Sequence, residues 1–188
     1  MVLFNSLFSK NNARKTNRSH TVIYESKLPD YIDSANKIYN KQYDSAISDL
    51  KAQLKKAKSN ELENISMIHI NLMQAYFKNR SRDNEFFDLS IFHAKEALKY
   101  GHNTGLAAFR LIVNLEKKMK IKHAIEVCKL VTSKNYHFSR FGFKQKPEFI
   151  ERLRKLSLKL EKLDDDSSEL FFTDKEKEMI ILNSNKNK

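Results

Sequence analysis

The chain has 188 residues, which is enough for one domain or for one domain with tails. Hydrophobic residues make up 40% of it, whereas it holds only 3 Gly and 2 Pro and no Trp. A β-rich fold of this length would need more turn residues, so the composition predicts an all-α protein. The net charge of +12 predicts attraction to an anionic partner, either nucleic acid, a membrane surface or an acidic protein.

The cysteine count and the hydropathy of the sequence indicate in which cellular compartment the protein is expected. Cys128 is the single cysteine of the sequence, so no intramolecular disulfide can form. This pattern suits a reducing compartment, and we expect a cytoplasmic protein. The sequence has no run of about 18 apolar residues, so we expect no membrane-spanning helix.

The first predicted element is a short amphipathic segment over residues 1–10, in which Leu3, Phe4, Leu7 and Phe8 recur at helical spacing. A basic linker follows, so residues 1–27 are expected to precede the folded domain. The segment lacks the charged region and the cleavage site of a signal peptide. Two uses stay open: weak contact with an anionic membrane surface, or docking on the protein's own core or disorder.

The folded domain is expected over residues 28–163. Apolar periodicity predicts three antiparallel helix pairs, at 30–41 and 43–57, at 61–79 and 85–100, and at 104–118 and 121–133. A further helix is expected to begin near Pro147. Its stripe of apolar residues from Phe149 to Leu163 could cap the end of the domain or pair with another helix.

Residues 164–188 are predicted to form an acidic, polar and disordered tail, apart from two apolar runs at residues 170–172 and 179–182. Eight acidic residues face three lysines between positions 161 and 178. Such a segment could stay solvated or fold back over the basic body, and we take Asp164, Asp165 and Asp166 to be solvated rather than metal-binding.

Small residues recur where two helices would touch. They are Ser90, Ala94 and Ala97, and one repeat later Ala124 and Cys128. Ser90 and Ala124 lie 34 residues apart, the period of a tetratricopeptide repeat. Together with Tyr76 on the preceding helix, these positions resemble the tetratricopeptide repeat (TPR) family over about residues 30–133. The interval from Ala46 to Ser90 is 44 residues, so the repeats are degenerate and other helical-hairpin solenoids stay open.

The resemblance implies a right-handed helical-hairpin solenoid of about three TPR-like pairs plus a C-terminal capping helix. Such solenoids commonly bind an extended peptide on a concave surface lined by the first helix of each pair. The sequence has no Gly-rich phosphate loop, nucleophile elbow or metal-ligand spacing. We therefore expect a non-catalytic adaptor or scaffold for another protein or peptide, without metal or cofactor, and with Cys128 buried in the core.

Candidate partner-binding residues follow from the repeat positions. They are Asn36, Asn71, Gln74 and Arg110. Asn36, Asn71 and Arg110 fall where some family members place two asparagines and an arginine that bind a peptide's C-terminal carboxylates. Ile32 and Leu106 stand where that clamp has lysines. The alternative is that these are ordinary polar residues on a solvated groove.

A second candidate is the segment from Lys134 to Lys146, in which aromatic and basic residues alternate. Its candidate nucleic-acid-binding residues are Lys134, Tyr136, Phe138, Arg140, Phe141, Phe143 and Lys144. Such rings can stack on unpaired bases of RNA or single-stranded DNA while the cations hold phosphates. Alternatively, the rings attach the segment to the core while its cations stay in water. The identity of the partner and the oligomeric state stay open.

Overall fold

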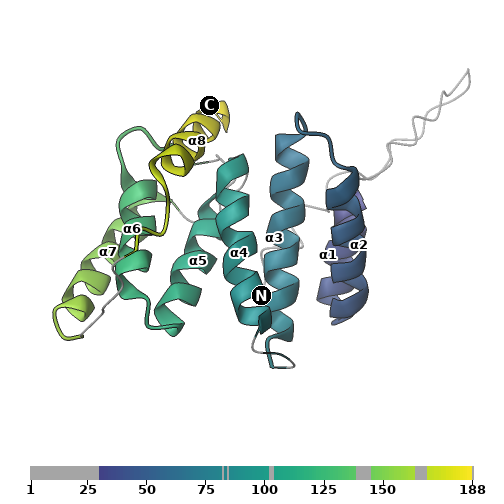
Figure 1. Ribbon diagram of the computed structural model, residues 1–188, viewed down its shortest axis with the longest axis horizontal. Helices are drawn as coiled ribbons and strands as arrows, with labels where there is room; N and C mark the ends of the chain where they lie inside the picture. The colour runs from purple at the N-terminus through teal and green to yellow at the C-terminus, as the bar shows by residue number, and fades with distance from the viewer. Residues whose placement is uncertain are drawn as a thin grey trace, which may run out of the picture.

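A computed structural model describes residues 30–81, 83, 85–101, 104–138, 145–163 and 169–187. Within these residues the chain is all-α, with eight α-helices and no strand (Figure 1). The predicted segment at residues 1–10 and its linker lie outside the described residues. The same holds for Arg140, Phe141, Phe143 and Lys144 and for Asp164, Asp165 and Asp166.

The first six helices form three antiparallel pairs, and each begins and ends within two residues of its predicted position. They are α1 (Asp30–Tyr39), α2 (Tyr43–Lys56), α3 (Leu62–Asn79), α4 (Glu85–Tyr100), α5 (Thr104–Lys117) and α6 (Ile121–Thr132). The first and third turns are tight because Lys41 and Met119 adopt positive φ angles of 62° and 59°, which reverse the chain within a few residues.

Helices that follow each other in the chain lie side by side in space, from α1 to α7 (Lys146–Leu160). The first helices of successive pairs also touch. Asn71 Nδ2 on α3 donates to the backbone oxygen of Tyr31 on α1 at 2.9 Å. Glu116 on α5 forms ion pairs with Arg152 and Lys159 on α7. The last of these helices buries Phe149 and Leu156 against α6, so its apolar stripe packs on the end of this chain's own helix stack.

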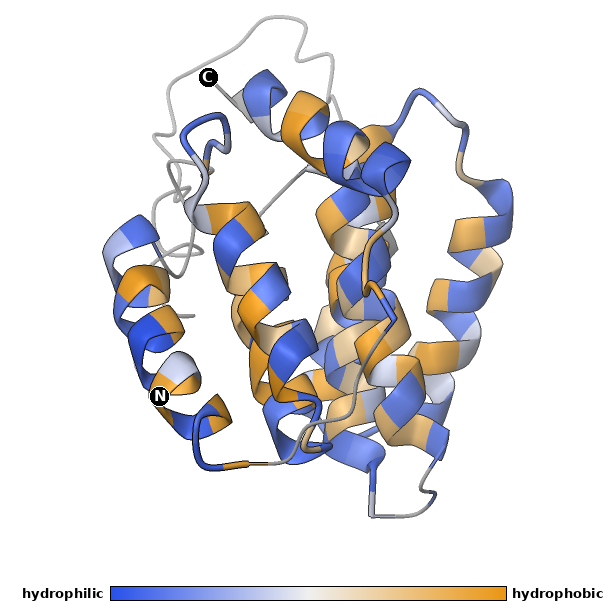
Figure 2. Cartoon of the chain, turned by 60° about the vertical axis from the view of Figure 1, so that its left-hand side comes forward, coloured by the Kyte–Doolittle hydropathy of each residue, from blue (hydrophilic) through white to orange (hydrophobic). Residues whose placement is uncertain are grey.

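Small residues bring α3, α4 and α5 close together, as predicted. Ser90 is fully buried, and its hydroxyl donates to the backbone oxygen of Met73 on α3 at 3.0 Å. Asn114 Nδ2 on α5 donates to the same hydroxyl at 3.0 Å. Cys128 is fully buried, as predicted, and burial raises the pKa of its thiol to about 12. Figure 2 shows hydrophobic and hydrophilic residues alternating along each helix, the pattern of helices that bury one side.

The prediction of a disordered tail over 164–188 needs correction for residues 169–187. The chain forms an eighth helix, α8 (Asp174–Ser184), followed by a short 3-10 turn (Asn185–Asn187). Thr173 and Glu176 cap the start of α8, because each side chain accepts a hydrogen bond from the other residue's backbone N–H. Phe172 and Ile180 are fully buried and join the core formed by α4, α5 and α6. The segment therefore folds back over the body.

None of the helices in the described part of the chain combines the length and the apolar character that crossing a membrane requires.

Candidate functional site

Three of the four predicted partner-binding residues lie at accessible positions on successive first helices. Asn36 is exposed on α1, whereas Gln74 on α3 and Arg110 on α5 are half-buried. Asn71 differs, because it is only 5% exposed and its amide nitrogen is bonded to the backbone of Tyr31. We therefore correct its assignment: Asn71 holds α1 against α3, and its donor is used inside the fold.

Arg110 belongs to a cationic cluster that surrounds the ring of Phe77 at the end of α3. The cluster consists of Phe77, Arg80, Arg110 and Lys117. The Cζ atoms of Arg80 and Arg110 lie 4.1 and 4.3 Å from the ring centroid, and Lys117 Nζ lies 5.2 Å from it. Cations at these distances are attracted to the electron-rich face of an aromatic ring. The ring therefore holds three positive charges within one small volume.

This cluster carries more positive than negative charge. Burial, and then the charge of Arg80, lowers the pKa of the Arg110 guanidinium. Its Nε atom is buried and has no hydrogen-bond partner among the described residues. Asp88 follows Arg80 in the sequence, but its carboxylate pairs with Lys118 at 2.9 Å and not with a member of the cluster.

Sequence reasoning found Arg110 but not Phe77 or Arg80. Phe77 and Arg80 are three residues apart at the end of α3, and Arg110 follows 33 residues after Phe77. That interval is close to the 34 residues between Ser90 and Ala124, and it is the signal in the sequence that could have suggested a contact between these side chains.

The predicted nucleic-acid segment has two of its rings in the core. Tyr136 is 3% exposed, and Phe138 is half-buried and stacks on Phe149 of α7, with ring centroids 5.3 Å apart. Tyr136 and Phe138 also contact each other edge to face at 5.1 Å. These two rings attach the segment to the core, whereas Lys134 is exposed.

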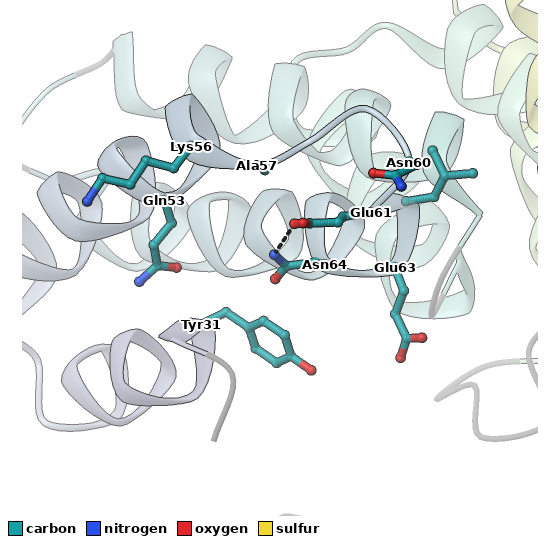
Figure 3. A pocket seen from close by; sticks show the side chains of 9 residues that line it. Tyr31, Gln53, Lys56, Ala57, Asn60, Glu61, Glu63 and Asn64 are labelled. Atoms are coloured by element: carbon teal, nitrogen blue, oxygen red, sulfur yellow. Dashed lines mark hydrogen bonds between the residues drawn. The ribbon is translucent and has the colours of Figure 1, made fainter. Parts of the chain in front are cut away.

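A hollow lies between α1, α2 and the start of α3, and Figure 3 draws the side chains that line it. Its volume is about 630 Å³. Its lining residues are Tyr31, Gln53, Lys56, Ala57, Asn60, Glu61, Leu62, Glu63 and Asn64. Burial and the charge of Glu63 raise the pKa of the Tyr31 hydroxyl. Asn64 Nδ2 donates to Glu61 Oε2 across the wall at 3.3 Å. The walls therefore present amides and charges of both signs, and we assign no reaction to them.

Two histidines meet between α3 and α4. The Nδ1 atoms of His69 and His93 are 2.9 Å apart, and both residues are buried. Tyr100 stacks on His69 and Tyr76 stacks on His93. Burial lowers the pKa of His69 to about 4 and that of His93 to about 3, so both rings are neutral at pH 7. In the described part of the chain, no three His, Cys, Asp or Glu side chains converge as metal ligands would.

The C-terminal segment (residues 169–187) is tied to α4 by several polar contacts. Lys95 Nζ donates to the backbone oxygen of Phe171 at 2.7 Å. Glu176 forms ion pairs with Lys95 at 3.2 Å and with Lys99 at 2.7 Å. Burial by itself raises the pKa of the Glu176 carboxyl. Hydrogen bonds from Lys99, from the Thr173 backbone and from Lys95 outweigh this effect and lower the pKa to about 2.

The same segment is tied to α6 by Glu126. The carboxylate of Glu126 accepts hydrogen bonds from the backbone N–H groups of Phe171 at 2.9 Å and Phe172 at 3.3 Å. It also pairs with Lys177 at 3.1 Å. The second helices α4 and α6 are therefore covered in part by the chain itself, at the positions that these contacts involve.

The arrangement defines an all-α protein with a cationic cluster between two first helices. Comparisons with protein-family models, with curated proteins and with solved structures find no match to this chain. Its function is therefore inferred from the geometry of the candidate site.

Proposed function

We propose that this chain is a non-catalytic, TPR-like scaffold that binds another protein through the face formed by the first helices α1, α3 and α5. The proposal includes a helical-hairpin solenoid of three pairs, in which α7 caps the last pair. It is supported by the 34-residue spacing of the small residues and by the contacts between successive first helices.

One observation carries the choice of face. The hydrogen bonds and ion pairs that fix the C-terminal segment go to α4, α6 and the residues after α6. The chain thus covers part of α4 and α6 with its own residues. A partner would then meet the opposite side, on which Asn36, Gln74 and Arg110 are accessible.

These side chains suit a bound protein segment. Amide side chains such as Asn36 and Gln74 both donate and accept hydrogen bonds, so each can pair with a peptide backbone. A guanidinium such as Arg110 forms charge-assisted bonds with an acidic side chain or a C-terminal carboxylate. The net charge of +12 would favour encounter with an acidic partner.

Site-specific photo-crosslinking in the native cell tests the face. A photoreactive residue replaces Asn36 or Gln74 on the first-helix face, and a matched control replaces Lys129, which is exposed on α6. We expect the same partner to be cross-linked from positions 36 and 74 and not from position 129. Cross-linking of that partner from position 129 alone, or of no partner from positions 36 and 74, would contradict the proposal.

A further inference from the structure

The cationic cluster around Phe77 joins the end of α3 to the end of α5. Arg80 follows α3 directly, and Arg110 and Lys117 lie two turns apart on α5. The Arg80 guanidinium also donates to the backbone oxygen of Phe77, which keeps its planar group close to the ring. The site is therefore built from two first helices and has its cations already in place.

No carboxylate pairs with Arg80, Arg110 or Lys117 in the described part of the chain. Two carboxylates that lie near Arg80 in sequence have other partners. Asp88 pairs with Lys118, and Asp83 Oδ1 accepts a hydrogen bond from the backbone of Glu85 at 2.8 Å. The positive charges of Arg80, Arg110 and Lys117 repel each other because they lie close together. An anion that binds among them would offset this repulsion by attracting all three.

We propose that the cationic cluster is an anion site that recognises a phosphate monoester on the protein partner. This inference rests on the proposed function and names the chemistry that the same face recognises. A phosphate monoester carries a charge of about −1.5 to −2 at pH 7 and three acceptor oxygens. A single carboxylate carries one charge and would leave most of the three cations uncompensated.

The geometry at Phe77 also favours a phosphorylated protein over a nucleic acid. Proteins that bind single strands combine cations with aromatic rings on which bases stack. At this site both guanidiniums lie over the ring of Phe77, within 4.3 Å of its centroid. The ring thus orients cations, and the guanidinium forks remain to bind oxygen atoms of the phosphate.

Binding of short peptides to the full chain tests the assignment. The probes are a neutral, fluorescently labelled peptide with one phosphoserine, the same peptide with serine or glutamate at that position, and a labelled oligouridylate. We expect the phosphoserine peptide to bind more tightly than the other three probes at low salt, measured by fluorescence anisotropy.

Variants of the cluster then locate the site. Arg80→Gln and Arg110→Lys should each weaken binding of the phosphoserine peptide by about tenfold or more, because each removes charge-assisted hydrogen bonds to the phosphate. Lys58→Ala removes one charge from an exposed position after α2 and should leave binding within about twofold. Arg80 is exposed, so its variant should keep the wild-type unfolding midpoint.

Several results would overturn the phosphate assignment. Equal affinity for the glutamate peptide would mean that a carboxylate is sufficient, and tighter binding of the oligouridylate would indicate a nucleic-acid surface. Absence of binding to all probes, or equal loss of affinity in Lys58→Ala, would remove the site. Cross-linking of a partner from Asn36 and Gln74 that persists in Arg80→Gln would refute this inference while leaving the proposed scaffold function intact.

Discussion

The buried contact between His69 and His93 makes the stability of the fold depend on pH. In the folded chain, burial lowers the pKa of His69 to about 4 and that of His93 to about 3. In the unfolded chain both have a pKa of about 6.5. Between pH 6.5 and pH 4 the unfolded state therefore binds more protons, so the free energy of unfolding falls as the pH falls.

The size of the effect follows from the same values. Each unit of pKa shift corresponds to about 1.4 kcal/mol, so lowering the pH from 7 to 5 costs about 2 kcal/mol per histidine and about 4 kcal/mol for the pair. His69 and His93 are 5% and 6% exposed, so water screens them little. Because a domain is stable by only about 5–15 kcal/mol, this loss is large enough to measure. Glu176, with a pKa lowered to about 2, contributes only below about pH 4.5.

Urea unfolding followed by far-ultraviolet circular dichroism at pH 7, 6 and 5 measures this loss. His69→Asn keeps a side-chain amide that can bond to His93 and removes one titrating group. Between pH 7 and pH 5 this variant should therefore lose about half as much free energy of unfolding as the wild type loses. His137→Asn changes a histidine outside this contact and should behave as the wild type does. The reasoning is refuted if the wild type is equally stable at pH 7 and pH 5, or if His69→Asn has the wild-type dependence.

Three further predictions concern the core and the C-terminal segment. Phe172→Ala should destabilise the protein by about 3–5 kcal/mol, because it removes a fully buried ring, whereas Leu170→Ala, at a position 70% exposed, should change stability by less than about 0.5 kcal/mol in urea unfolding. Gly101→Ala should speed hydrogen exchange in α8, because φ is 83° and the added Cβ would lie 2.6 Å from the backbone oxygen of Asn183; unchanged exchange would contradict this. The Cys128 thiol, with a pKa of about 12, should react with Ellman's reagent only when the chain unfolds, and rapid labelling of the native protein would show that it is accessible.

The three helix pairs could be predicted because their signals are local. Small residues at Ser90, Ala94 and Ala97 mark a close helix contact, and all three are fully buried. Apolar periodicity then places each helix, and short connections force neighbours to run antiparallel. None of these inferences needs knowledge of residues far away in the chain.

The eighth helix could not be predicted in the same way, because remote partners stabilise it. Its first turn is tied to Lys95 and Lys99, which precede it by about 75 residues, and to Glu126. Local signals existed, since Thr173 and Glu176 form a capping box. Two short apolar runs, at residues 170–172 and 179–182, supply the buried Phe172 and Ile180. The surrounding residues are polar and acidic, and the segment's own sequence does not show which distant lysines will pair with it.

For the candidate site too, the sequence predicted the position of a side chain but not its contacts with distant residues. The repeat position of Arg110 placed it on an accessible first helix, where the structure has it. The same reasoning assigned Asn71 to the partner, although its amide is bonded to the backbone of Tyr31. Repeat position gives the helix face of a side chain, whereas its use depends on which neighbours satisfy its polar atoms.

The C-terminal segment also has a mechanical consequence. A helix stack in which each helix contacts mainly its neighbours in the chain bends easily, because few contacts join distant helices. Here Glu176 is tied to α4 and Glu126 on α6 is tied to the same segment, so a cross-brace spans the second and third pairs. This brace stiffens the part of the stack from α4 to α6. The first pair is joined to α3 by hydrogen bonds from Asn71 to Tyr31 and from Asn79 to Asp44, but among the described residues no segment from elsewhere in the chain spans this junction. We therefore expect bending to concentrate between the first pair and α3.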